Sequence, residues 1–225
     1  MIKAVIFDYG GTLANSITPW DNVSEKAVER LSLDGIDIKA IYFQNAIMDT
    51  VEWRRIIHTE GREADSNEFF NHAIEILGHY ANRDATDELE MYVYEAGETE
   101  WLADLETLLP SLSENYKIAL LSNAWLEAPR QTLRDKGYSR WFDAMVCSYD
   151  IRIPKPDPRI FQHTLNLLEV DAFEAVMVGD NIKADIEGAI NAGLEAVWVD
   201  DEDTGEWKGH TVKNISELPM LLKNI

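Results

Sequence analysis

The pattern of apolar and polar positions divides most of the chain into short apolar runs separated by amphipathic stretches. Five runs are too short for helices and are typical of buried strands: residues 2–7, 117–121, 144–147, 175–178 and 196–199. Helices are predicted between and after these runs at residues 126–136, 158–168, 182–192 and 216–222. Strands that alternate with helices in this way predict an α/β fold, in which a parallel sheet carries helices on both faces.

The segment between the first two predicted strands has a different pattern. It contains few strand signals, and amphipathic stretches such as residues 22–33 and 67–78 predict helices. An insertion of this length is more typical of a small domain than of a loop. We therefore predict a core domain formed by residues 1–14 and 106–225, and an all-α domain formed by residues 15–105.

The composition is typical of a globular protein with a reduced thiol. Apolar residues make up 46% of the 225 positions, which suffices for one large core and a smaller second domain. The single cysteine, Cys147, excludes an internal disulfide and a four-cysteine metal site. No apolar stretch approaches the roughly 18 residues of a spanning helix, and the first residues lack a signal-peptide pattern. We therefore expect a cytoplasmic protein.

The charge is strongly negative. The chain has 41 acidic and 20 basic residues and a formal net charge of −21. Such a charge argues against nucleic acids and anionic membranes as partners. The sequence does not indicate an oligomeric state.

Polar residues that could take part in catalysis or metal binding follow the predicted strands. Asp8 ends the first strand, Ser122 and Asn123 end the second, Lys155 stands between two prolines after the third, and Asp180 follows the fourth. Ligands of open parallel sheets bind at the carboxyl ends of the strands, so we expect these side chains to converge. A carboxylate at the end of a buried strand is costly unless it is paired or bound to a metal. Asp8 is therefore expected to have a cationic partner.

Four short segments, in this order, resemble the motifs of the haloacid dehalogenase-like hydrolase superfamily. They are DYGGT at 8–12, LLSN at 120–123, Lys155 within IPKPDP, and GDNIKADIEGAINAG at 179–193. The predicted helical insertion lies where members with a helical cap domain carry it, between the first and second motifs. The resemblance implies a Rossmann-like core, an inserted cap domain and hydrolase activity.

The resemblance also implies catalytic roles for three of these residues. Asp8 resembles the nucleophile that attacks phosphorus to form an aspartyl-phosphate, which water then hydrolyses. Ser122 would donate a hydrogen bond to a phosphoryl oxygen, and Lys155 would supply positive charge to the same group. Three neighbouring residues would shape the loop or bind substrate: Gly11, Thr12 and Asn123.

A magnesium site is implied by the same resemblance. Mg²⁺ prefers carboxylate and carbonyl oxygens together with water and substrate phosphate. The implied ligands are the carboxylates of Asp8 and Asp180 and the backbone carbonyl of Gly10. Asp185 would either bind the metal ion directly or contact one of the residues that bind it.

One position departs from the family pattern. Phosphatases of the superfamily usually carry a second Asp two residues after the nucleophile, where it serves as general acid and base, and here that position is Gly10. Tyr9 should point to the opposite side of the strand and cannot easily replace it. General acid–base catalysis typically contributes about 10² to 10⁴ in rate. The loss would be large for an alkoxide leaving group and small for an acyl phosphate.

Several functions therefore stay open. The preferred prediction is a Mg²⁺-dependent phosphatase for a small phosphorylated metabolite, in which water, a cap residue or the substrate serves as the acid. A phosphate-binding protein with little or no turnover is the second. Carbon–halogen cleavage is less consistent, because dehalogenases of the superfamily carry Tyr at the position of Gly10. Phosphonate cleavage would need a Schiff-base lysine in the cap, where only Lys26 and Lys39 are present.

Overall fold

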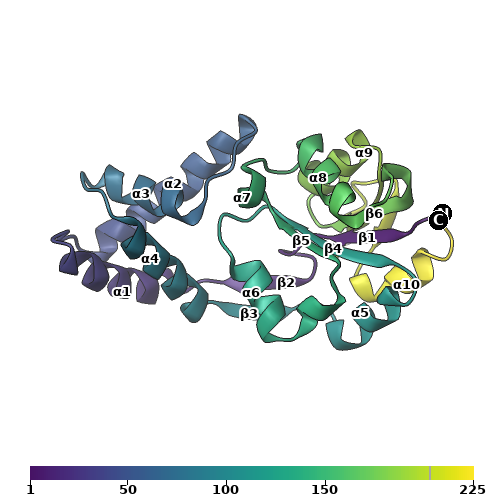
Figure 1. Cartoon of the computed structure of the whole chain (residues 1–225), viewed down its shortest axis with the longest axis horizontal. Coiled ribbons are helices and arrows are strands. Elements are labelled where there is room, and N and C mark those ends of the chain that lie inside the picture. Colours follow the sequence, from purple (N-terminus) through teal and green to yellow (C-terminus); the bar gives the residue numbers. More distant parts are fainter. Residues whose placement is uncertain (203) are drawn as a thin grey trace. The chain divides into compact units, whose positions relative to one another are not determined.

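The computed structural model describes residues 1–202 and 204–225 (Figure 1). The described chain divides into two compact units. Residues 1–15 and 99–225 form one unit, called the core unit below, and residues 16–98 form the other, called the helical unit. Among the described residues, no helix has the length and apolar character needed to cross a membrane.

The core unit is built on a six-stranded parallel sheet with the strand order β5-β4-β1-β6-β7-β8. The strands are β1 (Ala4–Phe7), β4 (Lys117–Ser122), β5 (Ala144–Cys147), β6 (Ala175–Gly179), β7 (Glu195–Val199) and β8 (His210–Val212). Five of them lie at the predicted apolar runs, which confirms the α/β fold class. The short strand β8 was not predicted, because three residues with a central Thr211 give no apolar run.

Helices cover both faces of this sheet, as predicted (Figure 1). On one face, α8 (Pro158–Leu168) packs through Phe161 against Ile6 and Leu121. On the other face, α5 (Leu105–Ser113) packs through Leu109 against Val5. Because successive strand residues point to opposite faces, the fully apolar β1 contributes to both cores.

Shorter helical elements complete the core unit. They are α6 (Ala128–Asp135), η1 (Tyr138–Trp141), α7 (Ser148–Ile151), η2 (Ala172–Glu174), the π-helical η3 (Ile182–Glu187), α9 (Gly188–Asn191), η4 (Ile215–Glu217) and α10 (Leu218–Leu221). The predicted helix at 182–192 therefore consists of a π-helix followed by one α-helical turn.

The register of the three central strands brings the predicted site residues to one edge. Phe7, the last residue of β1, pairs with Leu120 of β4 and with Val178 of β6. Asp8 therefore lies level with the ends of both neighbouring strands, close to Ser122, which ends β4, and Asp180, which follows β6.

The helical unit consists mainly of α1 (Trp20–Leu33), α2 (Ala40–Thr59), α3 (Ser66–Ile76) and α4 (Arg83–Ala96). Fully buried aromatic side chains fill its interior: Phe43, Phe69 and Phe70. Asp65 caps the amino end of α3, and its side chain accepts a hydrogen bond from the amide of Glu68. Two further strands, β2 (Ala14–Ile17) and β3 (Glu98–Trp101), form a separate two-stranded sheet.

Candidate active site

The ammonium group of Lys155 forms the centre of the candidate site. Its Nζ donates hydrogen bonds to Asp8 Oδ1 at 2.7 Å, to Asp185 Oδ1 at 2.6 Å and to the carbonyl oxygen of Leu121 at 2.7 Å. The side chain is only 2% exposed. Burial lowers the pKa of Lys155, but the two carboxylates outweigh burial and raise it to about 12. Lys155 is therefore a buried, permanently charged cation that is fully paired.

Asp8 is positioned by the central strand. It follows β1 directly, and its amide donates to the carbonyl oxygen of Val178 at 2.9 Å. Burial raises the pKa of Asp8, Lys155 lowers it, and Asp185 raises it again, so that it lies at about 7. Lys155 is thus the partner that a buried carboxylate requires, but it does not compensate the whole cost of burial.

Three carboxylates gather around this position. One oxygen each from Asp8, Asp180 and Asp185 lies within 4.8 Å of the others. Burial raises the pKa of Asp180, and the nearby Asp185 raises it further. One lysine among three acids leaves excess negative charge, and an all-oxygen donor set suits a hard divalent cation such as Mg²⁺. The residues present therefore fit a metal ion.

Two glycines allow the backbone to approach these carboxylates. A Cβ atom at Gly11, whose φ is +69°, would lie 2.2 Å from Asp180 Oδ2. A Cβ atom at Gly179 would lie 2.3 Å from Asp185 Oδ2. Any larger residue at either position would displace a carboxylate. That Gly11 shapes the loop stays a prediction, and this close approach would be its physical basis.

Asp185 lies within the π-helix η3. Its Oδ1 accepts from Lys155, and its Oδ2 accepts from the amide of Asn181 at 3.0 Å. The side chain is 1% exposed. Both carboxylate oxygens are therefore engaged within the protein, and the most direct contact of Asp185 is with the lysine.

Asn123 has a contact that the sequence analysis did not foresee. Its side-chain oxygen accepts from the amide of Lys155 at 2.7 Å, and its side-chain nitrogen donates to the carbonyl oxygen of Lys155 at 3.0 Å. Pro154 and Pro156 have no amide hydrogen, so the amide of Lys155 is the only backbone donor of this tripeptide. Asn123 thus fixes the backbone that carries the lysine. Ser122 is buried beside it at the end of β4.

The loop after β1 turns tightly around the carbonyl oxygen of Tyr9, which accepts hydrogen bonds from the amides of Thr12, Leu13 and Ala14. Thr12 is buried, and Tyr9 lies in the core that contacts α5. Gly10 is exposed, and a Cβ atom at Gly10 would have no heavy atom within 4 Å. The place of the family's second Asp is therefore open space, and Tyr9 does not fill it.

Two sets of contacts at the carboxyl end of β7 were not predicted from the sequence. The indole nitrogen of Trp198, on β7, donates to the carbonyl oxygen of Asp180 at 2.7 Å. The buried Asp200, which follows β7, accepts hydrogen bonds from the amides of Thr204 and Gly205. The contact of Trp198 joins residues 18 positions apart, so no local pattern indicates it.

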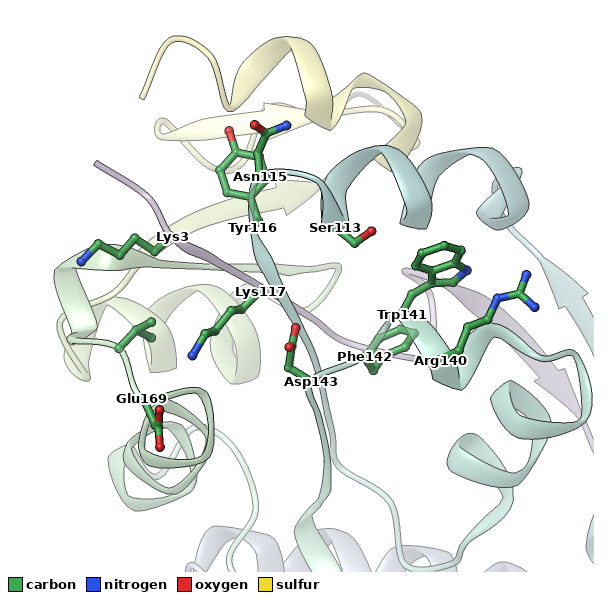
Figure 2. Close-up of a pocket in the computed structure, with 11 residues that line it drawn as sticks. Lys3, Ser113, Asn115, Tyr116, Lys117, Arg140, Trp141, Phe142, Asp143 and Glu169 are labelled. Carbon is green, nitrogen blue, oxygen red and sulfur yellow. The ribbon is translucent and has the colours of Figure 1, made fainter.

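A separate cavity of about 460 Å³ lies at the opposite edge of the sheet. Figure 2 shows Lys3, Lys117 and Asp143, which stand at the amino ends of β1, β4 and β5. Lys3 is paired with Glu174, and Lys117 Nζ donates to the carbonyl oxygen of Leu168 at 2.6 Å. None of the predicted site residues lines this cavity.

Several phosphatases are similar in sequence to this chain. The N-acylneuraminate-9-phosphatase of Homo sapiens is 34% identical over 128 residues, which make up 54% of this chain and 52% of that protein. The chain thus matches about half the length of the first of these relatives. The glyceraldehyde 3-phosphate phosphatase of Methanocaldococcus jannaschii is 24% identical over 233 residues, which cover 100% of this chain and 99% of that protein.

Solved structures share the fold. A 2-haloacid dehalogenase from Pseudomonas syringae superposes with a TM-score of 0.72 and 23% identity, covering 100% of this chain and 99% of that one. A phosphatase from Thermococcus onnurineus superposes with a TM-score of 0.70 and 24% identity, covering 98% of each chain. Residues 2–193 match the model of the haloacid dehalogenase-like hydrolases. The chain therefore belongs to the haloacid dehalogenase-like hydrolase family, as its motifs indicated.

Proposed function

We propose that the protein is a Mg²⁺-dependent phosphatase that hydrolyses a small phosphorylated metabolite through an aspartyl-phosphate on Asp8. The observation that carries the proposal is the contact of Lys155 with Asp8 beside a cluster of three carboxylates. This arrangement offers a nucleophile, a fixed cation and a set of metal ligands at one strand edge. The phosphatase relatives support the same reaction class.

Asp8, Asp180 and the carbonyl of Gly10 would hold the metal ion. When bound, Mg²⁺ would neutralise negative charge on the phosphoryl oxygens. Both oxygens of Asp185 already accept hydrogen bonds within the protein, so we propose that it acts mainly by holding Lys155. The hydroxyl of Ser122 would donate to a phosphoryl oxygen.

The chemistry then needs two displacements at phosphorus. An oxygen of Asp8 attacks, and the bond from phosphorus to the leaving oxygen breaks with its electron pair on that oxygen. Water next attacks the aspartyl-phosphate, which releases the Asp8 carboxylate and dihydrogen phosphate. Lys155 stays protonated throughout and stabilises the negative charge of the phosphoryl group. Such covalent catalysis replaces one difficult step by two easier ones.

Gly10 has no side chain that could protonate a leaving group, and this limits which substrates can react quickly. Within the described core unit, the acids near Asp8 are Asp180 and Asp185, which belong to the same cluster. We propose that the leaving oxygen takes its proton from water, from the substrate or from the helical unit acting as a cap. A leaving group of low basicity, such as a carboxylate, would need no acid at all.

A phosphate-binding protein with little turnover is the second candidate. The open position at Gly10 favours it, because a site without a general acid and base can bind phosphate and still react slowly. Such a protein would keep Asp180 and Lys155 for binding.

A metabolite screen tests these functions. Phosphate release from a panel of phosphate monoesters and acyl phosphates would be measured with Mg²⁺ and with a chelator, alongside the nearly isosteric variant Asp8→Asn. We expect Mg²⁺-dependent release that Asp8→Asn abolishes. Phosphate binding without release from any compound would favour the second candidate. Release that persists in Asp8→Asn would contradict the mechanism.

A further inference from the structure

Two segments of the core unit each carry one proposed catalytic residue. Ser122 ends β4, and the chain continues through residues 123–127 into α6. Cys147 ends β5, and the chain continues through α7 to Lys155. The position of Lys155 relative to Ser122 therefore depends on contacts between these two segments.

Near the sheet, Ala124 and Asn123 make these contacts. The carbonyl oxygen of Ala124 accepts from Ser148 Oγ at 3.1 Å and from the amide of Tyr149 at 3.2 Å. The side chain of Asn123 pairs with the backbone of Lys155. The hydroxyl of Tyr149 also donates to Glu127, and Arg130, in the first turn of α6, adds further contacts between the segments.

Arg130 bridges the two segments with charge-assisted hydrogen bonds. Its Nε donates to Glu127 Oε2 at 2.9 Å, within its own segment. Its Nη1 and Nη2 donate to Asp150 Oδ2 and Oδ1, each at 3.0 Å, in the other segment. Nη2 also contacts the hydroxyl of Tyr149, and Nη1 donates to the carbonyl oxygen of Met145 at 3.3 Å.

The positive charge of Arg130 compensates the negative charges on either side of it. The Arg130 side chain is 15% exposed and stands between two carboxylates, Glu127 and Asp150. Asp150 Oδ2 also accepts from the amide of Cys147 at 2.9 Å, which fixes the start of α7. Without the guanidinium, the two carboxylates would repel each other across the gap between the segments.

We propose that Arg130 is a positioning residue, which holds the segment carrying Lys155 against the segment carrying Ser122. The consequence for activity rests on the proposed phosphatase function. Lysine would not reproduce the bridge, because its ammonium cannot form the bidentate fork to Asp150 while it also contacts Glu127.

A double-mutant cycle tests the effect on activity. We expect Arg130→Gln to lower kcat for phosphate release by roughly 10- to 100-fold, since small displacements of catalytic groups have effects of this size. In a Lys155→Ala background, the same substitution should lower kcat by less than about twofold. Equal fold losses in both backgrounds would mean a general effect on the fold and would overturn the proposal.

Arg134→Gln is the matched control. Arg134 lies on the same helix and contacts the same Glu127, but it is 45% exposed and its described partners are Glu127 and Gln131. We expect kcat within about twofold of the parent value for this variant. A loss as large as that of Arg130→Gln would overturn the proposal.

Hydrogen exchange gives a readout that needs no activity. The amide of Lys155 donates to Asn123, so it should be protected from exchange in the parent protein. We expect roughly tenfold faster exchange in a peptide covering residues 148–157 for Arg130→Gln, and parent rates for Arg134→Gln. If Arg130→Gln does not fold, Arg130→Lys takes its place with a smaller increase expected. Unchanged exchange in the folded variant overturns the proposal, whereas an inactive parent protein overturns only the phosphatase function.

Discussion

A single buried ammonium determines the charge balance at the ends of the central strands. Lys155 pairs with Asp8 and Asp185, yet the pKa of Asp8 still lies at about 7, chiefly because burial disfavours its charged form. The sequence predicted that Asp8 needs a cation and that Lys155 lies near it. It did not predict that Asn123 fixes the lysine backbone, because that contact joins residues 32 positions apart.

At Gly10, restoring a carboxylate should restore acid–base catalysis. The backbone of Gly10 does not lie in the left-handed region, and a Cβ atom there would meet no heavy atom within 4 Å. We expect Gly10→Asp to raise kcat on an unactivated phosphate monoester by up to about 10² to 10⁴, with a smaller gain on p-nitrophenyl phosphate. Steady-state phosphate release measures both.

Gly10→Asn is the control, because its amide has nearly the same size and cannot transfer the proton. Equal rates for the Asp variant, the Asn variant and the parent on both substrates would show that the missing acid does not limit the reaction.

At the scale of elements, the apolar pattern predicted strands well and helix types less well. Helix α8 and strand β5 have the predicted bounds, because both carry strong apolar patterns. The segment 182–192 has a helical pattern, but its first part is the π-helix η3, in which Asp185 contacts the distant Lys155. Periodicity cannot register such contacts.

Strand β6 must end in a glycine. A Cβ atom at Gly179 would lie 2.3 Å from Asp185 Oδ2 and 2.5 Å from Asp185 Cβ, so the whole side chain would have to move. We expect Gly179→Ala to lower the free energy of unfolding by about 1 to 3 kcal/mol and to weaken Mg²⁺ binding. Gly10→Ala, in the same site but in open space, should change stability by less than about 0.5 kcal/mol. Urea unfolding and calorimetry measure these effects, and equal stability of the two variants would contradict the account.

Glu63, in the loop between α2 and α3, is buried and forms an ion cluster with two side chains of α2. Glu63 accepts from Arg54 at 2.7 and 2.6 Å and contacts His58 Nε2 at 2.9 Å. Arg54 is thus engaged within the helical unit. Burial raises the pKa of Glu63, but the hydrogen bonds from His58 and Arg54 outweigh it and lower the value to about 2.

This cluster predicts a pH-dependent stability. The folded-state pKa of Glu63 lies below its unfolded value of 4.5, so its contribution is fully present above pH 4.5 and is lost as the pH falls towards 2. We expect Glu63→Gln to lower the free energy of unfolding by roughly 3 kcal/mol at pH 7 and by much less near pH 2. Urea unfolding across this range measures the difference. Glu52→Gln, at an exposed pair with Arg55, should have little effect at any pH, and a pH-independent loss in Glu63→Gln would contradict the assignment.

The whole molecule has a net charge of −21, but its candidate site contains a buried, positively charged lysine. The sequence predicted two domains with a division near residues 15 and 105, and the compact units are residues 16–98 and the remainder. That the helical unit acts as a cap stays a prediction. Its contribution to specificity could not be derived from the sequence, because no motif within it specifies a ligand.

Mg²⁺ should stabilise the whole protein against unfolding. A ligand that binds only the folded state stabilises it by about 2.7 kcal/mol at a concentration of 100 times its Kd. We expect a higher Tm with Mg²⁺ in the parent and no such shift in Asp180→Asn. The control is Glu217→Gln, an exposed acid outside the carboxylate cluster, which should keep the shift. A shift retained by Asp180→Asn would contradict its assignment as a ligand.

The most direct test of the central claim is detection of the phosphoryl group on Asp8. A substrate found in the metabolite screen would be mixed with the protein and Mg²⁺, quenched in acid within milliseconds, and the peptides mapped by mass spectrometry. The account predicts a phosphorylated peptide carrying Asp8 that forms at the rate of the first displacement and is absent from Asp8→Asn. Substrate hydrolysis without any phosphorylated Asp8, or with the phosphoryl group on another residue, would contradict it.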